Sequence, residues 1–199
     1  MTEPAAQEDE AFYVEQKLDE LTSIINEPTL AETIREIKEA FQSKKHYLAD
    51  IAYKDPKTGL WNKFYFNTRL HEEAVRAHRY NRSLTMMVIE MGETLSDHFI
   101  QAAGSVASSI RRSDTCAYIR DLRLNILLPE TSLRQGERVA NKIHSLLRKN
   151  INIDADVDLY IGVADFNKAR NTAEKISSSA TKACENALKQ RIPVYTAPS

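Results

Sequence analysis

Residues 55–66 of the chain read DPKTGLWNKFYF, and the prediction of the fold begins from this segment. Gly59 permits a sharp turn, and either Thr58 or Asn62 can cap a helix that begins immediately afterwards. The apolar residues downstream then recur at helical spacing. The segment therefore predicts a turn that opens a helix over residues 62–80.

Beyond that helix the pattern alternates between strands and helices. Continuous or alternating apolar runs predict strands, and apolar residues three and four apart predict helices. Strands are expected at 84–90, 115–119, 123–128, 157–164 and 193–196, and helices near 96–110, 132–150 and 171–190. The second and third strands form a hairpin around Arg120, Asp121 and Leu122. This order predicts an α/β sandwich with a central mixed sheet.

The N-terminal part has a different character. Residues 1–9 predict an irregular tail, residues 10–25 a helix, and a second helix carries Ile34, Ile37, Phe41, Lys44, Leu48 and Ile51 at heptad spacing. Such a seam serves either to dimerise the protein or relay a signal, or to pack the helix on its own domain. We therefore expect a helical segment, residues 1–51, and a globular domain, residues 52–199.

Composition excludes several classes of function. The 199 residues carry a formal net charge of -1, which argues against nucleic acid as a partner. The N-terminus lacks the apolar region of a signal peptide, and no stretch approaches the roughly 20 apolar residues that span a membrane, so direct membrane insertion is not expected. Cys116 and Cys184 are far apart, and we expect reduced thiols in a cytoplasmic protein.

Five stretches together resemble the GGDEF family of diguanylate cyclases. Residues 55–66 are similar to its D-x-L-T-G-L-x-N entry motif, and the other four read MMVIE at 86–90, RRSD at 111–114, ILLPET at 126–131 and YIGVA at 160–164. They occur in the family's order and span about residues 52–195. The resemblance implies a nucleotidyl-cyclase-like fold with a ferredoxin-like palm.

The residues that the family uses for catalysis are altered here. Its reaction joins two GTP molecules with the help of metal ions bound to carboxylates, and glycines let the signature hairpin approach the triphosphate. In this chain the five positions of the family's signature hairpin read Arg120, Asp121, Leu122, Arg123 and Leu124. Both glycines are absent, and Leu122 or Arg123 replaces the metal-binding acid, depending on the register.

Other parts of the family's active site also depart from the pattern. Glu90 survives at the end of its strand, but Gly92 stands where a second Asp is common. About a dozen residues of the guanine-reading segment after Glu90 are missing, and the phosphate-contacting run near 187–193 has lost its Gly and Asn. The sequence therefore predicts no catalytic residues, no metal and no cofactor.

Arg111 and Asp114 match the R-x-x-D pair of the family's inhibitory site, where cyclic di-GMP binds, and Lys142 falls at the position of a further basic residue. Arg can form a bidentate fork on phosphate or a guanine edge, and Asp can accept from guanine N–H groups. Alternatively, Arg111 ends a helix favourably against its dipole and Asp114 caps the strand entry.

These features predict a non-catalytic signalling module of a bacterial cyclic di-GMP pathway that acts as an adaptor or scaffold. Its partner would be another signalling protein, and the N-terminal helix could form a homodimer. The alternative is a cyclic di-GMP receptor using Arg111, Asp114 and Lys142, and an active cyclase is a third interpretation. The charged tip at 120–123 fits either a contact surface or an ordinary solvated turn.

Overall fold

The computed structural model describes residues 16–19, 28–93, 98–150, 158–166 and 172–198. The chain forms two compact units, Met1–Ala52 and Tyr53–Ser199. None of the described helices has both the length and the apolar character needed to cross a membrane.

The first unit contains the helical segment. Residues 16–19 are helical, and the remainder of the helix expected at 10–25 lies outside the described residues. Helix α2 (Pro28–Tyr53) carries the heptad positions and reaches the first residue of the second unit. Ile34 is buried and Ile37 is half exposed, while an ion pair joins Lys38 to Asp19. The side chains of Leu48 and Ile51 lie outside the described residues, so the coiled-coil seam stays a prediction.

The second unit alternates helices and strands in the expected order. Its elements are α3 (Lys63–Tyr80), β1 (Leu84–Met91), α4 (Phe99–Ser109), β2 (Thr115–Arg120), β3 (Arg123–Pro129), α5 (Leu133–Asn150), β4 (Leu159–Asp165), α6 (Ala173–Gln190) and β5 (Val194–Thr196). The strands form one sheet in the order β2-β3-β1-β4-β5. All neighbours are antiparallel except β4 and β5, which makes the sheet mixed, as predicted.

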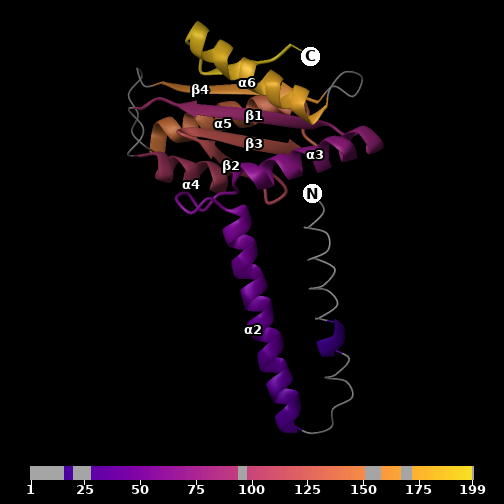
Figure 1. Cartoon of the computed structure of the whole chain (residues 1–199). Coiled ribbons are helices and arrows are strands. Elements are labelled where there is room, and N and C mark those ends of the chain that lie inside the picture. Colours follow the sequence, from indigo (N-terminus) through magenta and orange to yellow (C-terminus); the bar gives the residue numbers. More distant parts are fainter. Residues whose placement is uncertain (1–15, 20–27, 94–97, 151–157, 167–171, 199) are drawn as a thin grey trace. The chain divides into compact units, whose positions relative to one another are not determined.

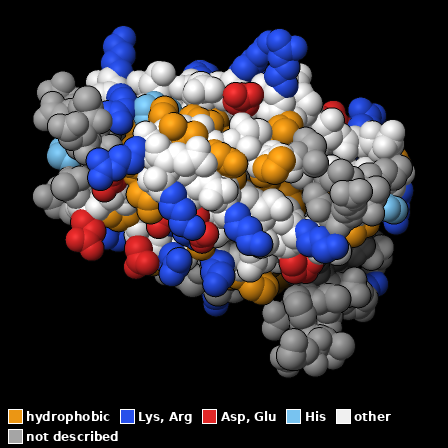
Figure 2. Space-filling view, turned by 90° about the horizontal axis from the view of Figure 1, so that it is seen from above, with side chains coloured by type: hydrophobic (Ala, Val, Ile, Leu, Met, Phe, Trp, Pro, Cys, Tyr) orange, Lys and Arg blue, Asp and Glu red, His pale blue; other side chains and the backbone are white. Residues whose placement is uncertain are grey.

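Helices cover both faces of this sheet (Figure 1). One core joins α4 and α5 to one face, around Phe99, Ile126 and Ile143. The other core joins α3 and α6 to the opposite face, around Phe66 and Ile176. The face over α6 carries scattered apolar patches between Lys and Arg side chains rather than one continuous apolar surface (Figure 2). The α/β sandwich predicted from the sequence is therefore confirmed.

The entry segment forms the turn and cap that its residues predict. The Asp55 carboxylate accepts hydrogen bonds from the backbone N–H and the hydroxyl of Thr58, each at 2.8 Å, and Gly59 has φ +69°. Asn62 caps α3 by accepting from the backbone N–H of Tyr65 at 2.9 Å. The carbonyl of Trp61 accepts from the N–H of Tyr118 at 2.9 Å, so the entry segment also covers the β2 edge of the sheet.

Element boundaries differ slightly from the predictions around the longer loops. Helix α4 has His98 as its N-cap, without a side-chain capping bond, and residues 96 and 97, where the predicted helix began, lie outside the described residues. Strand β4 begins at Leu159, and residue 157, where the predicted strand began, lies outside the described residues. Helix α6 has Thr172 as its N-cap, without a side-chain capping bond, and Asn171, where the predicted helix began, lies outside the described residues. Loops fix such boundaries through contacts that periodicity does not encode.

Candidate functional site

The signature positions lie where predicted, at the turn between β2 and β3. Arg120 and Arg123 face each other across the turn, with a bulge between Tyr118 and Arg120. Asp121 at the tip adopts a left-handed conformation, with φ +45°. The hairpin borders a cleft of about 840 Å³, which we call the hairpin cleft. Its lining residues are Glu90, Met91, Gly92, Glu93, Arg120, Asp121, Leu122, Arg123, Asp158, Tyr160, Cys184 and Leu188.

Strand register places Arg123 directly opposite Glu90. The two residues pair across β1 and β3, and an Arg123 N–H donates to Glu90 Oε2 at 2.7 Å. The Arg123 side chain is 14% exposed and that of Glu90 is 43% exposed. The register therefore decides that Arg123, and not Leu122, lies beside the carboxylate at the end of β1.

This arrangement does not fit the metal ions of the family's reaction. A guanidinium bonded to Glu90 brings positive charge to the place where a carboxylate would have to bind a cation. Asp158, also in the cleft, accepts a hydrogen bond from the Tyr160 hydroxyl at 3.0 Å. Within the described part of the chain, no three His, Cys, Asp or Glu side chains converge as metal ligands.

Neither cysteine is poised for chemistry. Cys116 and Cys184 are free and buried, as expected. Burial raises the pKa of the Cys116 thiol to about 12. Burial, with the negative charge of Glu90, raises the pKa of Cys184 to about 12 as well. Both thiols are therefore protonated near neutral pH, and neither is an activated nucleophile.

Arg111 and Asp114 form a tight local turn. The Arg111 N–H donates to Asp114 Oδ2 at 2.9 Å, and the Asp114 N–H donates to the Arg111 carbonyl at 3.0 Å. The Asp114 carboxylate thus caps the turn between α4 and β2. Burial raises its pKa, against the opposing effects of the Arg111 N–H bond and the Arg111 charge. The Arg111 side chain remains exposed.

Lys142 lies close to this turn. It projects from α5 and donates from Nζ to the Ser109 carbonyl, at 3.3 Å, at the end of α4. The structure therefore brings the three predicted residues to the same end of α4. Asp114 is engaged within its own turn, while Arg111 and Lys142 are exposed cations.

A second cleft contains arginines that the sequence pattern did not single out. This cleft, which we call the arginine cleft, has a volume of about 440 Å³ and includes Arg111. Its lining residues are Arg69, Glu73, Arg76, Ala77, Arg82, Ser83, Leu84, Arg111, Ser113, Pro129 and Glu130. Arg69, Glu73 and Arg76 share one face of α3 at three- and four-residue spacing, which is the signal that the sequence did contain.

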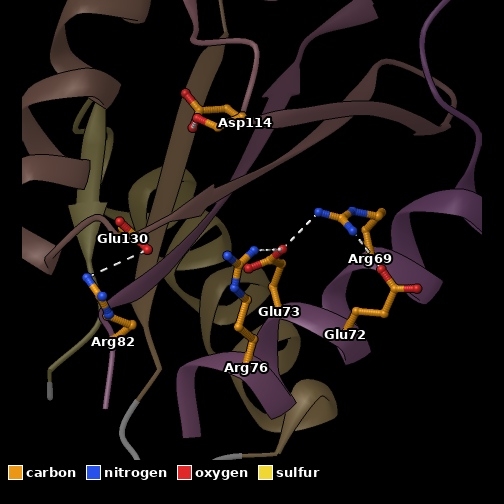
Figure 3. Close-up of polar contacts among 8 residues, drawn as sticks. Arg69, Glu72, Glu73, Arg76, Arg82, Asp114 and Glu130 are labelled. Atoms are coloured by element: carbon orange, nitrogen blue, oxygen red, sulfur yellow. Dashed lines mark hydrogen bonds and ion pairs between the residues drawn. The ribbon is translucent and has the colours of Figure 1, made fainter. Parts of the chain in front are cut away.

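Four ion pairs order the residues in and beside the arginine cleft (Figure 3). Arg69 binds the buried Glu73 at 2.8 Å and Glu72 at 2.7 Å. Arg76 approaches the same Glu73 oxygen to 3.6 Å. On the other side, Arg82 lies 3.8 Å from Glu130. Asp114 lies apart from these pairs in the same view.

Comparison with known proteins identifies the class. Residues 52–192 match the family described as "Diguanylate cyclase, GGDEF domain". This match covers more than half of the chain, and the chain therefore belongs to the GGDEF family. A curated relative, diguanylate cyclase DgcP from Pseudomonas aeruginosa, is 27% identical over 119 residues, which cover 54% of this chain and 18% of DgcP. The chain thus spans less than a fifth of that relative.

Solved structures show the same fold. The coiled coil and GGDEF domain of DgcB from Caulobacter crescentus, in complex with c-di-GMP, aligns with a TM-score of 0.70 and 15% identity, over 85% of this chain and 97% of that one. Diguanylate cyclase SiaD from Pseudomonas aeruginosa, in complex with its activator SiaC, aligns with a TM-score of 0.68 and 19% identity, over 97% of this chain and 79% of SiaD. The FimX GGDEF domain from Pseudomonas aeruginosa aligns with a TM-score of 0.64 and 17% identity, over 72% of this chain and 98% of that one.

Proposed function

We propose that this chain is a non-catalytic GGDEF domain that acts as a protein-binding adaptor or scaffold in a bacterial, cytoplasmic cyclic di-GMP pathway. The observation that carries this proposal is the 2.7 Å ion pair between Arg123 and Glu90. Joining two GTP molecules requires cations that neutralise phosphate charge and clamp the reacting oxygens. Glu90 is bonded to a guanidinium, and the described residues include no three His, Cys, Asp or Glu side chains that converge on a cation.

The helical segment supports the adaptor role. A GGDEF structure that aligns over 97% of this chain is a complex with a protein activator, so this combination of helices and domain is compatible with partner binding. In α2, Ile37 is an exposed large apolar side chain at a heptad position, 52% accessible. An exposed apolar residue in such a seam favours contact with a second helix, from a partner or from another copy of this chain.

The cyclase activity itself provides the first prediction. With GTP and MgCl₂ or MnCl₂, the purified chain should form no cyclic di-GMP above a protein-free control, as measured by chromatography. Because the described residues of the cleft form no cluster of metal ligands, 10 mM MgCl₂ should also leave the melting temperature within about 1 °C, whereas a ligand at 100 times its Kd would add about 2.7 kcal/mol of stability. Product formation, or saturable stabilisation by Mg²⁺, would refute the non-catalytic assignment.

The adaptor role is tested by capture followed by reconstitution. The full chain, used as bait beside an Ile37→Asp bait, should retain a protein that then forms a stoichiometric complex when both components are purified. A charge in an apolar seam is costly to bury, so the variant should lose at least about tenfold in affinity if α2 is the contact. Failure of every captured protein to form such a complex would argue against the adaptor role.

A second candidate function is reception of cyclic di-GMP. The observation in its favour is the gathering of Arg111 and Lys142 around the turn that Asp114 caps. Both cations are exposed, and Arg111 also lines the arginine cleft, so phosphate groups could reach it.

Calorimetric titration of cyclic di-GMP distinguishes a receptor from an adaptor that does not bind cyclic di-GMP. If the chain is a receptor, Kd should be micromolar or tighter, and Arg111→Ala should weaken binding by at least about tenfold, which is 1.4 kcal/mol. Arg112→Ala is the matched control, because this neighbouring arginine is exposed and lies outside the cleft lining. Absence of heat at high ligand concentration would eliminate the receptor candidate.

A further inference from the structure

The inner wall of the arginine cleft is built on one buried carboxylate. Glu73 has only 7% of its side chain exposed, and it is paired with both Arg69 and Arg76. A buried carboxylate between two guanidiniums fixes their positions without presenting its own charge to solvent. Each guanidinium has five N–H donors, so both retain donors for another acceptor. Two arginines thus line the cleft in a preformed arrangement (Figure 3).

The mouth of the cleft is held much more weakly. Arg82 and Glu130 are 60% and 57% exposed and 3.8 Å apart. They stand beside two left-handed backbone positions, Asn81 with φ +53° and Glu130 itself with φ +51°. An exposed ion pair at this distance contributes little to stability. Glu130 can therefore be exchanged for an acceptor from outside at little cost.

We propose that the arginine cleft binds an acidic segment of the protein partner, whose carboxylates contact Arg76 and Arg82 and displace Glu130. This inference rests on the adaptor function proposed above and names the chemistry of its partner. Four arginines against two glutamates leave the cleft lining with an excess of positive charge, although the whole chain has a net charge of -1. Charge complementarity of this kind sets partner specificity and accelerates association.

The lining also favours protein carboxylates over a nucleotide as the occupant. Between the arginines the lining includes Ala77, Leu84 and Pro129, of which Ala77 and Leu84 are buried, and none of the described lining residues is an aromatic on which a base could stack. Arg presents a planar fork that matches a carboxylate with two parallel hydrogen bonds. An extended Glu- or Asp-rich segment would therefore satisfy several of these donors at once.

The test is fluorescence anisotropy with a fluorescein-labelled peptide of eight glutamates, titrated with the full chain at 50 and 150 mM NaCl. A peptide of eight glutamines is the uncharged control. The glutamate peptide should bind with Kd of about 100 μM or tighter at low salt, and more weakly at high salt, because exposed charges are screened. The glutamine peptide should bind at least about tenfold more weakly.

Variants locate the peptide in the cleft. Arg76→Gln and Arg82→Gln should each weaken binding at least about fivefold, and Glu130→Gln should strengthen it about threefold by freeing Arg82. Arg138→Gln is the control, because Arg138 is exposed on α5 and lies outside the lining. Because Arg82 is exposed, Arg82→Gln should stay folded, and thermal melting verifies this. This variant therefore tests whether the peptide lies in the cleft even if Arg76→Gln unfolds.

The proposal would be overturned by no binding of the glutamate peptide, by equal binding of the glutamine peptide, or by binding that Arg82→Gln leaves unchanged. In a competition assay at matched ionic strength, inorganic phosphate should displace the labelled peptide less effectively than unlabelled peptide does. Equal displacement by phosphate would also overturn the proposal, in favour of a small-anion site. Because the assay uses neither GTP nor a captured protein, failure here leaves the adaptor function to its own test.

Discussion

Gly162→Ala should lower the free energy of unfolding by about 3 kcal/mol, because overpacking costs 1–3 kcal/mol and here the obstacle is backbone. A Cβ at position 162 would lie 2.1 Å from the Cys184 nitrogen and 2.4 Å from the Ala180 carbonyl oxygen, so β4 and α6 would have to separate. In a chain of this size that loss corresponds to a fall in melting temperature of about 10 °C. Urea denaturation and thermal melting both measure the effect.

Gly104→Ala is the matched control for this prediction. An added Cβ there meets nothing within 4 Å, and Gly104 is exposed within α4. Alanine in a helix interior is favoured over glycine by about 0.5–1 kcal/mol, so this variant should be slightly more stable than the natural chain. Equal stability of the two variants would show that α6 does not depend on the close approach at Gly162.

The contact at Gly162 also matters for the site. Cys184, whose backbone packs on Gly162, lines the hairpin cleft together with Leu188, and both belong to α6. Displacement of α6 would therefore change the wall of the cleft as well as the core. For this reason a functional effect of Gly162→Ala would carry no information about the site unless stability were measured beside it.

The fold could be predicted because its determinants are local. The continuous apolar run of β1 marked a strand buried on both faces, and all its residues from Leu84 to Ile89 are buried. Asn62 could be recognised as a cap, and it does accept the Tyr65 N–H. The turn at Asp121 lies between two alternating runs, so the hairpin followed from periodicity alone.

Much of the candidate site could not be predicted, because it depends on register and on separate segments. The sequence left open whether Leu122 or Arg123 replaces the signature acid, and only the pairing of β1 with β3 sets Arg123 against Glu90. The arginine cleft combines α3, the turn after it, the turn before β2 and the end of β3. Arg82 and Glu130 are far apart in sequence, so no spacing rule associates them.

The second large expected effect on stability concerns the ion pair of Glu90 and Arg123. Glu90→Ala should lower the free energy of unfolding by about 2 kcal/mol, because it removes the carboxylate bonded to a guanidinium that is 14% exposed. The expected cost lies below the 3–5 kcal/mol of a fully buried pair, since Glu90 is 43% exposed and water can partly replace it. Glu93→Ala is the control: Glu93 is exposed in the same cleft, and its loss should stay within about 0.5 kcal/mol.

A double-mutant cycle tests whether the two charges act on each other. Arg123→Met keeps an apolar stem of similar length and leaves Glu90 to be hydrated, so alone it should cost about 1 kcal/mol. The loss in free energy of unfolding of the double variant should be smaller, by at least about 1 kcal/mol, than the sum of the losses of the two single variants, because neither charge is then left unpaired. Additive losses would mean that the 2.7 Å contact contributes nothing to folding. Coupled losses would mean that Arg123 has a structural role beside Glu90, at the place where a cyclase requires a cation.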